Sequence, residues 1–217
     1  MADDPEFRST VVSQVVTQPH AALENLPPER TVYWRVEAVS WGGCRPSSGP
    51  PGSFATPHLD RPAGIVFLSE IAWARANAGA ENPVRRDVNY YGKPIAINGG
   101  VYPKGLWTHS YPDATPADIV YEIANKKFEW FKADVGLDDA SGGGSVQFQV
   151  LVDGGQKAES PILRPRQVHR FRVNVADAGQ VTLRVLNAGD GYACDHAAWG
   201  AARFTEAGVR DPLDKTE

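Results

Sequence analysis

The sequence predicts an all-β protein whose main part is a jelly-roll β-sandwich. Its 217 residues include 21 Gly and 17 Pro, a composition that favours many short strands and turns over helices. Short apolar runs recur along the chain and are separated by turn signals such as Asp153-Gly154-Gly155. This spacing is typical of two packed antiparallel sheets.

Charge and hydropathy exclude two classes of partner. The formal net charge is −4 and the basic residues are scattered, so no basic stripe is available for nucleic acid. No apolar run reaches the roughly 18 residues that a membrane-spanning helix needs, and no secretory signal pattern opens the chain. We therefore expect neither a nucleic-acid nor a membrane partner.

The N-terminal quarter is expected to be separate from the rest. Residues 1–10 are polar, and we expect them to be disordered or to derive from a cloning junction. Thr31–Val39 alternates, with Val32, Trp34 and Val36 on one face. This pattern predicts one continuous strand.

A run within this region, N-L-P-P-E-R-T-V-Y-W-R-V-E-A-V, resembles the last strands of a fibronectin type III domain. The resemblance covers residues 11–57, with a loop at Gly42–Gly52 and a short strand at Ser53–Thr56. Val32 stands where that family has its corner tyrosine, and the first strands are missing. Half a sandwich leaves a strand edge uncovered.

The main domain is predicted to run from residue 65 to 206, after a linker at 58–64 and before a tail at 207–217. Ile65–Ser69 is predicted as its first buried strand, and Ala74–Asn89 as a loop. Further strands are predicted at Pro94–Asn98, Ile119–Ile123, Phe128–Val135, Val146–Val152, Val168–Val175 and Val181–Leu186.

Polar clusters fall in three connections of this domain, and the densest is the predicted loop Gly189–Phe204. Because the loops of a sandwich gather at its two ends, we expect these clusters to converge. Carboxylates and histidines can bind sugar hydroxyls, and an aromatic face can cover the C–H patch of a sugar ring. The candidate carbohydrate-binding residues are Trp107, His109, Asp138, Asp139, Asp190, Tyr192, Asp195 and His196.

Each candidate also has a purely structural explanation. Trp199 is expected to be a core anchor because Trp is highly buried on average. Trp107 is predicted to be an exposed stacking platform, with core packing as the alternative. Asp138 and Asp139 would serve equally well in closing a turn, and single histidines are often structural.

Nothing in the sequence favours catalysis. Ser110, His109 and Asp113 are near one another, but no G-x-S-x-G elbow occurs. The run Gly142–Gly144 lacks the Lys-Ser/Thr ending of a phosphate loop. We therefore expect no enzyme activity and no required cofactor.

The two cysteines, Cys44 and Cys194, are far apart in the sequence. A disulfide requires Cα atoms within roughly 7 Å, and each cysteine belongs to a different predicted domain. Two unpaired thiols are favoured, with a structural bridge as the alternative.

Ordered motifs along the main domain resemble the family abbreviated NPCBM, which is related to the family 51 carbohydrate-binding modules. They are F-L-S-E-I-A-W at 67–73, R-R-D at 85–87, K-P-I-A-I-N-G at 93–99, Y-P-K-G-L-W-T-H at 102–109, V-G-L-D-D at 135–139, G-S-V-Q-F-Q-V-L-V-D-G at 144–154 and D-H-A-A-W at 195–199. The resemblance implies a galactose-binding-like jelly roll, a non-catalytic role and terminal galactose-type ligands. It also implies a structural calcium ion in some relatives.

This chain departs from the family pattern at three positions. Ala198 and Ala201 stand where the family often has acidic residues, and calcium prefers carboxylate oxygens. The implied calcium site is thereby weakened. Trp107 stands where the family commonly has glycine, so the ligand preference is expected to differ.

The sequence as a whole predicts non-catalytic binding of galactose-type glycans. The resemblance implies an extracellular location and a longer parent chain, either a glycoside hydrolase or a surface protein. The alternative is an extracellular structural or protein-interaction module without sugar affinity.

Overall fold

The computed structural model describes residues 6, 8, 31–40, 43–46, 50–55, 63–78, 83–113 and 115–214. The chain divides into two compact units, residues 1–60 and 61–217. The predicted strands before Thr31 and most of the predicted linker at 58–64 lie outside the described residues.

The first unit contains two pairs of short antiparallel strands. β1 (Thr31–Trp34) pairs with β4 (Gly52–Ala55), and β2 (Glu37–Ser40) pairs with β3 (Gly43–Pro46). The single strand predicted over 31–39 is therefore wrong, because the chain leaves β1 after Trp34 and starts a separate hairpin. Part of the predicted 42–52 loop is strand β3. The likeness to a fibronectin type III domain is not confirmed.

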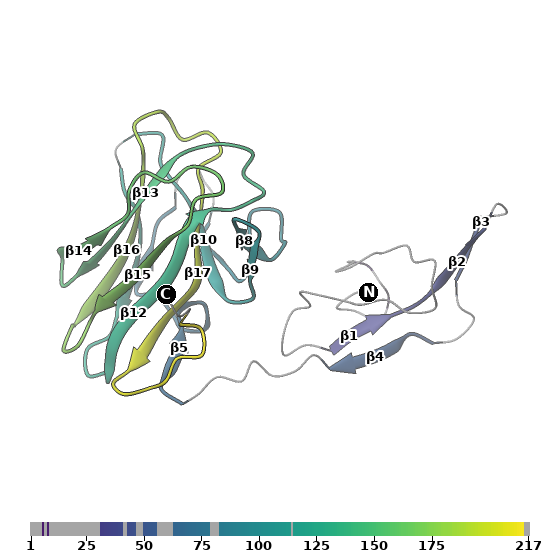
Figure 1. Cartoon of the computed structure of the whole chain (residues 1–217), viewed down its shortest axis with the longest axis horizontal. Helices are drawn as coiled ribbons and strands as arrows, with labels where there is room; N and C mark the ends of the chain where they lie inside the picture. Colours follow the sequence, from purple (N-terminus) through teal and green to yellow (C-terminus); the bar gives the residue numbers. More distant parts are fainter. Residues whose placement is uncertain are drawn as a thin grey trace. The chain divides into compact units, whose positions relative to one another are not determined.

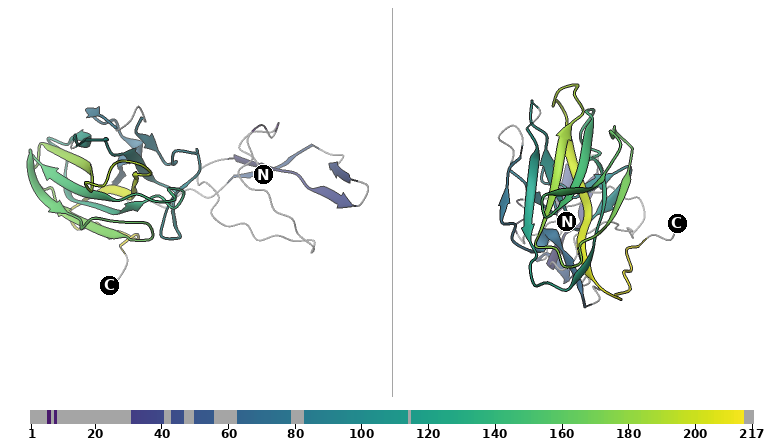
Figure 2. Two further views of the ribbon diagram at one scale, coloured as in Figure 1. Left: turned by 90° about the horizontal axis from the view of Figure 1, so that it is seen from above. Right: turned by 90° about the vertical axis from the view of Figure 1, so that its left-hand side faces the viewer.

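The second unit contains two larger antiparallel sheets (Figures 1 and 2). The first sheet has the order β15-β12-β17-β10-β7, and β5 pairs with β17 off this path. Its strands are β5 (Ile65–Phe67), β7 (Arg85–Arg86), β10 (Gly105–His109), β12 (Phe128–Leu137), β15 (His169–Asn174) and β17 (His196–Glu206).

The second sheet has the order β14-β13-β16-β11-β6. Its strands are β6 (Arg75–Ala76), β11 (Ala117–Glu122), β13 (Val146–Val152), β14 (Gly155–Glu159) and β16 (Gln180–Asn187). A 3₁₀ turn, η1 (Leu68–Glu70), follows β5, and the hairpin of β8 (Ile95–Ile97) and β9 (Gly100–Tyr102) stands outside both sheets.

The two sheets enclose one hydrophobic core. Trp199 of β17 is fully buried, and its ring centroid lies 5.0 Å from that of Phe148 on the opposite sheet. Phe131 and Phe171 approach the same indole from neighbouring strands. The predicted all-β sandwich and the predicted role of Trp199 as a core anchor are confirmed.

Most strand predictions differ from the structure by only one or two residues, but residues 189–204 differ more. The sequence predicted a loop over this whole stretch. The structure ends the loop at Asp195, and His196 begins β17, the longest strand, which lies between β12 and β10. The alternation of small and large residues after His196 supplies this strand with one core face, to which Ala197 and Trp199 contribute.

A second, smaller hydrophobic cluster lies on the other face of the first sheet. It is formed where the β8–β9 hairpin covers β10 and β17, and it consists of Ile95, Ile97, Tyr102, Trp107 and Ala198. The first sheet is therefore covered on both faces near its centre.

The C-terminal segment, predicted as a tail from 207, packs on the domain as far as residue 214. Asp211 is only 7% exposed, because it pairs with basic side chains of the first sheet. None of the helices in the described part of the chain is long and apolar enough to span a membrane.

Candidate functional site

The outer face of β10 and β17 brings two histidines together. Side chains alternate along a strand, so Trp107 and His109 share the face opposite the core residue Leu106. His109 is the register partner of His196, and Ala198 is that of Trp107. The two imidazole centroids are 5.5 Å apart, and the Trp107 ring lies 5.4 Å from His196.

Three exposed tyrosines surround these histidines. Tyr90 and Tyr91 come from the turn after β7, and Tyr192 comes from the loop before β17; their exposed fractions are 42%, 59% and 42%. Tyr90 and Tyr91 lie 5.6 and 6.1 Å from His196, and Tyr192 lies 6.1 Å from His109. We call the site formed by Tyr90, Tyr91, Trp107, His109, Tyr192 and His196 the aromatic–histidine cluster.

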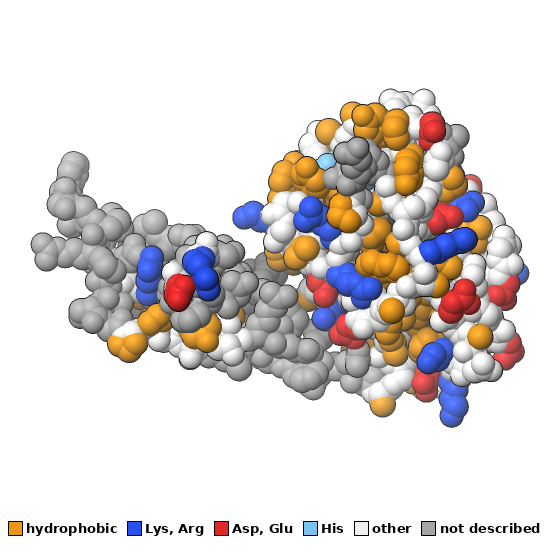
Figure 3. Space-filling view, turned by 180° about the vertical axis from the view of Figure 1, so that it is seen from behind, with side chains coloured by type: hydrophobic (Ala, Val, Ile, Leu, Met, Phe, Trp, Pro, Cys, Tyr) orange, Lys and Arg blue, Asp and Glu red, His pale blue; other side chains and the backbone are white. Residues whose placement is uncertain are grey.

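The surface shows a similar mixture of side chains. Figure 3 shows a face on which hydrophobic side chains gather beside a small visible part of a histidine, with Lys and Arg side chains near them. Such a surface offers flat apolar rings together with groups that exchange hydrogen bonds, the combination that a sugar ring requires.

Trp107 does not present the predicted open face. Its side chain is fully buried, because the β8–β9 hairpin and Tyr90 pack against it. Its indole Nε1 has no hydrogen-bond partner among the described residues. Trp107 therefore supports the floor of the cluster, and the exposed aromatic surface comes from the tyrosines.

The two histidines differ in their surroundings. His109 Nδ1 lies 2.9 Å from the Ser110 carbonyl oxygen; because a carbonyl only accepts, Nδ1 carries the proton and Nε2 of the neutral ring is an acceptor. His196 Nδ1 is buried without a partner. Burial lowers the pKa of His196, and its neighbour His109 lowers it further. His196 is therefore neutral at pH 7.

Asp195 anchors the loop below the cluster. It is 1% exposed, and it accepts hydrogen bonds from Ser110 Oγ at 2.6 Å and from the Ser145 amide at 3.0 Å. Burial raises its pKa, although the Ser110 hydrogen bond opposes that shift. Asp190 accepts from Ser145 Oγ at 2.8 Å. Asp190 and Asp195, which both lie in the loop before β17, thus link that loop to the connection before β13. Asp195 also links it to the segment after β10.

Gly144 permits this close approach of two connections. It has φ +89, and a Cβ atom there would lie 2.5 Å from the Cys194 carbonyl oxygen and 2.8 Å from Asp195 Oδ1. Any side chain would force the 190–195 loop away. Cys194 itself is an exposed free thiol, whereas the side chain of Cys44 lies outside the described residues.

Asp138 and Asp139 bind the backbone of the covering hairpin. Asp138 is 1% exposed, and it accepts hydrogen bonds from Asn89 Nδ2 and from the Ala96 amide. Asp139 accepts from the amides of Asn98 and Gly99, at 2.8 and 2.7 Å. These contacts agree with the structural explanation, in which the two aspartates close turns. They also hold the hairpin over Trp107.

The predicted convergence of the three clusters is confirmed. Asp195 reaches Ser110, the neighbour of His109, and the Asp138 amide donates to the His196 carbonyl at 2.8 Å. Whether each of the eight predicted residues contacts a sugar stays a prediction. His109, His196 and Tyr192 line the cluster, whereas the four aspartates hold its supporting loops.

Sequence reasoning missed Tyr90, Tyr91 and Arg85. Arg85 was placed in the predicted loop at 74–89, where it belongs to the R-R-D motif, and Tyr90 and Tyr91 were given no role. Arg85 in fact lies on β7, directly opposite Trp107, and its guanidinium carbon is 5.4 Å from the Tyr90 ring centroid. Two adjacent tyrosines before Gly92, in a connection between strands, were the sequence feature that could have indicated this part of the site.

The residues do not fit the calcium ion that the family resemblance implies. Among the described residues, no three His, Cys, Asp or Glu side chains are grouped as metal ligands. Asp138 and Asp195 already accept hydrogen bonds, and Ala198 is buried in the cluster beneath the hairpin. Calcium binding stays untested.

Residues 64–205 match the family model described as the NPCBM/NEW2 domain. The chain is similar to the CBM51 from Clostridium perfringens GH95 in complex with methyl-galactose, at 27% identity and TM-score 0.59, covering 65% of this chain and 99% of that one. It is also similar to the CBM51-2 in complex with GlcNAc and INT domains from C. perfringens ZmpB, at 30% identity and TM-score 0.59, covering 81% and 37%.

A curated relative from Renibacterium salmoninarum is named "Putative endo-alpha-N-acetylgalactosaminidase". It is 25% identical over 151 residues, which make up 66% of this chain and 10% of the relative. This chain therefore spans about a tenth of the length of that relative. The match of the family model to most of the chain, together with the sandwich described above, shows that the chain belongs to the NPCBM/NEW2 domain family.

Proposed function

We propose that this chain is a non-catalytic carbohydrate-binding module and that the aromatic–histidine cluster is its sugar site. The observation that best supports this proposal is that the His109 and His196 rings lie side by side, in contact with exposed tyrosines. The similar CBM51 structures in complex with methyl-galactose and with GlcNAc support a monosaccharide ligand.

The chemistry of the cluster suits a hydroxylated sugar ring. Because His109 Nδ1 faces the Ser110 carbonyl, its other ring nitrogen, Nε2, is the one left to bond a sugar hydroxyl, although the side chain is only 6% exposed. The Tyr192 ring can cover the C–H face of the sugar. Because such a site is shallow, its affinity is expected to be weak, with a binding free energy of about −4 to −6 kcal/mol.

We further propose that the module operates outside the cell and forms part of a longer chain with a catalytic domain. A similar solved structure contains CBM51 domains together with an M60 catalytic domain, and the curated relative is about ten times longer than the matched stretch. The proposed role is to hold that larger protein on a glycan surface.

Calorimetry with methyl galactoside and with GlcNAc tests the sugar site, after a glycan array has shown which class binds. Tyr192→Ala should weaken binding about twofold to twelvefold, because one aromatic face contributes about 0.5–1.5 kcal/mol. The matched control is Leu213→Ala, which truncates a side chain of similar exposure, 41%, on the C-terminal segment.

Thermal unfolding of both variants checks that the fold is intact. Loss of affinity in Tyr192→Ala alone supports the site. Equal affinities for the two variants would place the sugar elsewhere, and an array without any bound glycan would favour the alternative structural or protein-interaction module.

A further inference from the structure

Arg85 places a positive charge beside the aromatic–histidine cluster. It pairs in register with Trp107 across β7 and β10, so it stands on the same outer face. Its guanidinium carbon lies 5.4 Å from the Tyr90 ring centroid and 6.0 Å from that of Trp107. The cation thus lies between the floor of the cluster and its exposed rim.

No carboxylate of the described residues forms an ion pair with Arg85. The nearest one in sequence, Asp87, pairs with Lys104 and accepts from the Gly105 amide. The neighbouring Arg86 differs in this respect, since its guanidinium donates to the carbonyls of Ser69 and Ile71. Arg85 Nε is buried and has no hydrogen-bond partner.

The carboxylates near the cluster are likewise engaged by other groups. Asp138 and Asp195 are both 1% exposed and accept hydrogen bonds from the protein itself. Asp190 is held by Ser145. Besides these carboxylates, of which Asp190 is exposed, the cluster presents one guanidinium, two imidazoles and three phenol rings, and Arg85 is the group among them that is always protonated.

We propose that the sugar bound at this cluster carries an anionic substituent, a carboxylate or a sulfate, which Arg85 recognises. A guanidinium presents paired donors that match two oxygens of either group. The aromatic rings hold its plane and reduce its contact with water, which strengthens the attraction to an anion. This inference rests on the proposed function and specifies its ligand as a sugar with an acidic substituent.

The test compares four sugars on the same protein by calorimetry: methyl galactoside, galacturonic acid, galactose 3-sulfate and galactose 6-sulfate. We expect at least one anionic sugar to bind about tenfold or more tightly than methyl galactoside, since hydrogen bonds between charged groups contribute about 1.5–3 kcal/mol. The affinity for galacturonic acid, compared with the affinities for the two galactose sulfates, shows whether the site prefers a carboxylate or a sulfate.

Arg85→Gln should bring the ratio of anionic to neutral affinity to about one. Arg75→Gln is the matched control, because Arg75 also lies on a two-residue edge strand but on the other sheet, and it should keep the ratio of the wild type. Thermal unfolding of both variants shows whether each remains folded.

The outcomes separate this inference from the function on which it rests. If methyl galactoside binds as tightly as every anionic sugar, or if the preference survives in folded Arg85→Gln, the role of Arg85 is refuted while sugar binding stands. If none of the four sugars binds while GlcNAc or another glycan of the array does, the role of Arg85 is refuted and sugar binding stands. If no glycan binds at all, both proposals fail.

Discussion

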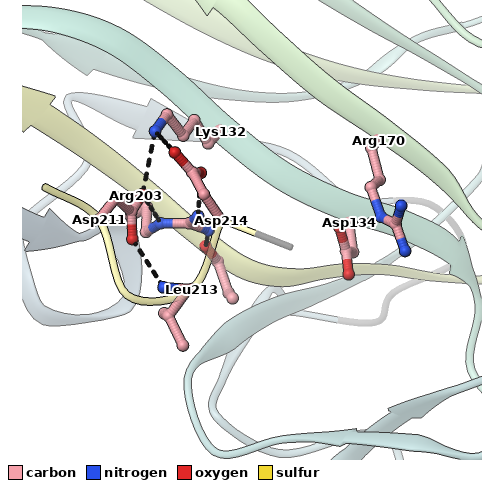
Figure 4. A network of polar contacts seen from close by, with 8 residues as sticks. Lys132, Asp134, Arg170, Arg203, Asp211, Leu213 and Asp214 are labelled. Atoms are coloured by element: carbon pink, nitrogen blue, oxygen red, sulfur yellow. Dashed lines mark hydrogen bonds and ion pairs between the residues drawn. The ribbon is translucent and has the colours of Figure 1, made fainter. Parts of the chain in front are cut away.

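Arg203 Nε donates a 2.7 Å hydrogen bond to Oδ2 of Asp211, which ties the C-terminal segment to β17 (Figure 4). Lys132 Nζ reaches the same oxygen at 3.1 Å. Asp214 accepts from both cations, at 2.5 Å from Lys132 and 3.2 Å from Arg203. The two basic side chains are 7% and 6% exposed, so these two carboxylates are what neutralises them.

This network predicts a loss of stability in acid. Arg203 and Lys132 lower the pKa of Asp211, although burial opposes the shift. Protons therefore bind the unfolded chain more readily, and the stabilising contribution is complete above the ordinary Asp pKa of about 3.9 and is lost as the pH falls through the lower folded value. Asp211→Asn should cost about 3 kcal/mol at pH 7.

Melting temperatures of the wild type and of Asp211→Asn, measured from pH 7 to pH 2.5, check this prediction. The difference between them should shrink toward the acid end. The control is Asp177→Asn, an exposed position whose positive φ suits Asn equally well. A constant difference across the whole range would contradict the proposed role of the Asp211 charge.

Truncation of Trp107 is expected to act on stability. The side chain is fully buried beneath the β8–β9 hairpin, so Trp107→Ala should leave a cavity and cost about 3–5 kcal/mol. Trp107→Phe should cost much less, because it keeps a ring and removes an indole N–H that has no partner. Denaturant unfolding of both variants measures this; equal stability of Trp107→Ala and the wild type would show that the floor of the cluster is open.

Burial of His196 predicts a second pH effect, near neutrality. Its folded pKa lies below the ordinary value of about 6.5, so the unfolded chain takes up the proton first. The stability is full above pH 6.5 and decreases as the pH falls toward the folded pKa. His196→Gln should flatten the stability curve between pH 7.5 and pH 5.

The measurement requires a suitable background. Burial also lowers the pKa of His169, which contributes with the same sign. The comparison is therefore made with His169→Gln present in both proteins. Parallel curves with and without His196 would indicate that its protonation is equally easy in the folded and unfolded states.

Asp139 is expected to hold the covering hairpin in place. Its two oxygens accept hydrogen bonds from the amides of Asn98 and Gly99, at the turn between β8 and β9. Asp139→Ala should cost about 1 kcal/mol, since exposed amides can bond to water instead, and Asp139→Asn should cost less. Amide hydrogen exchange at Asn98 and Gly99 reports the effect directly, and unchanged protection in Asp139→Ala would contradict it.

The strands and the sandwich could be predicted because they depend on local patterns. Val146–Val152 was predicted with its exact bounds, and Trp199 was recognised as a core residue. Residues 196–204 were mistaken for a loop because the polar residues of 190–196 masked the start of the strand. The hydrogen bonds that tie the aspartates to distant loops could not be predicted from the sequence. Ser110 and Asp195, for example, lie 85 residues apart.

By itself the sequence determined the β-sandwich, its main core and the convergence of polar clusters at one end, because a period of two residues assigns each strand a buried face. Only the tertiary structure decided what covers the opposite face. That face holds Trp107, His109 and His196, and alternation alone leaves it open to solvent. The β8–β9 hairpin buries Trp107, and tyrosines from two connections pack beside the histidines, which leaves His196 half-buried and His109 only 6% exposed. The segment after Glu206 buries Lys132 and Arg203 in the same manner.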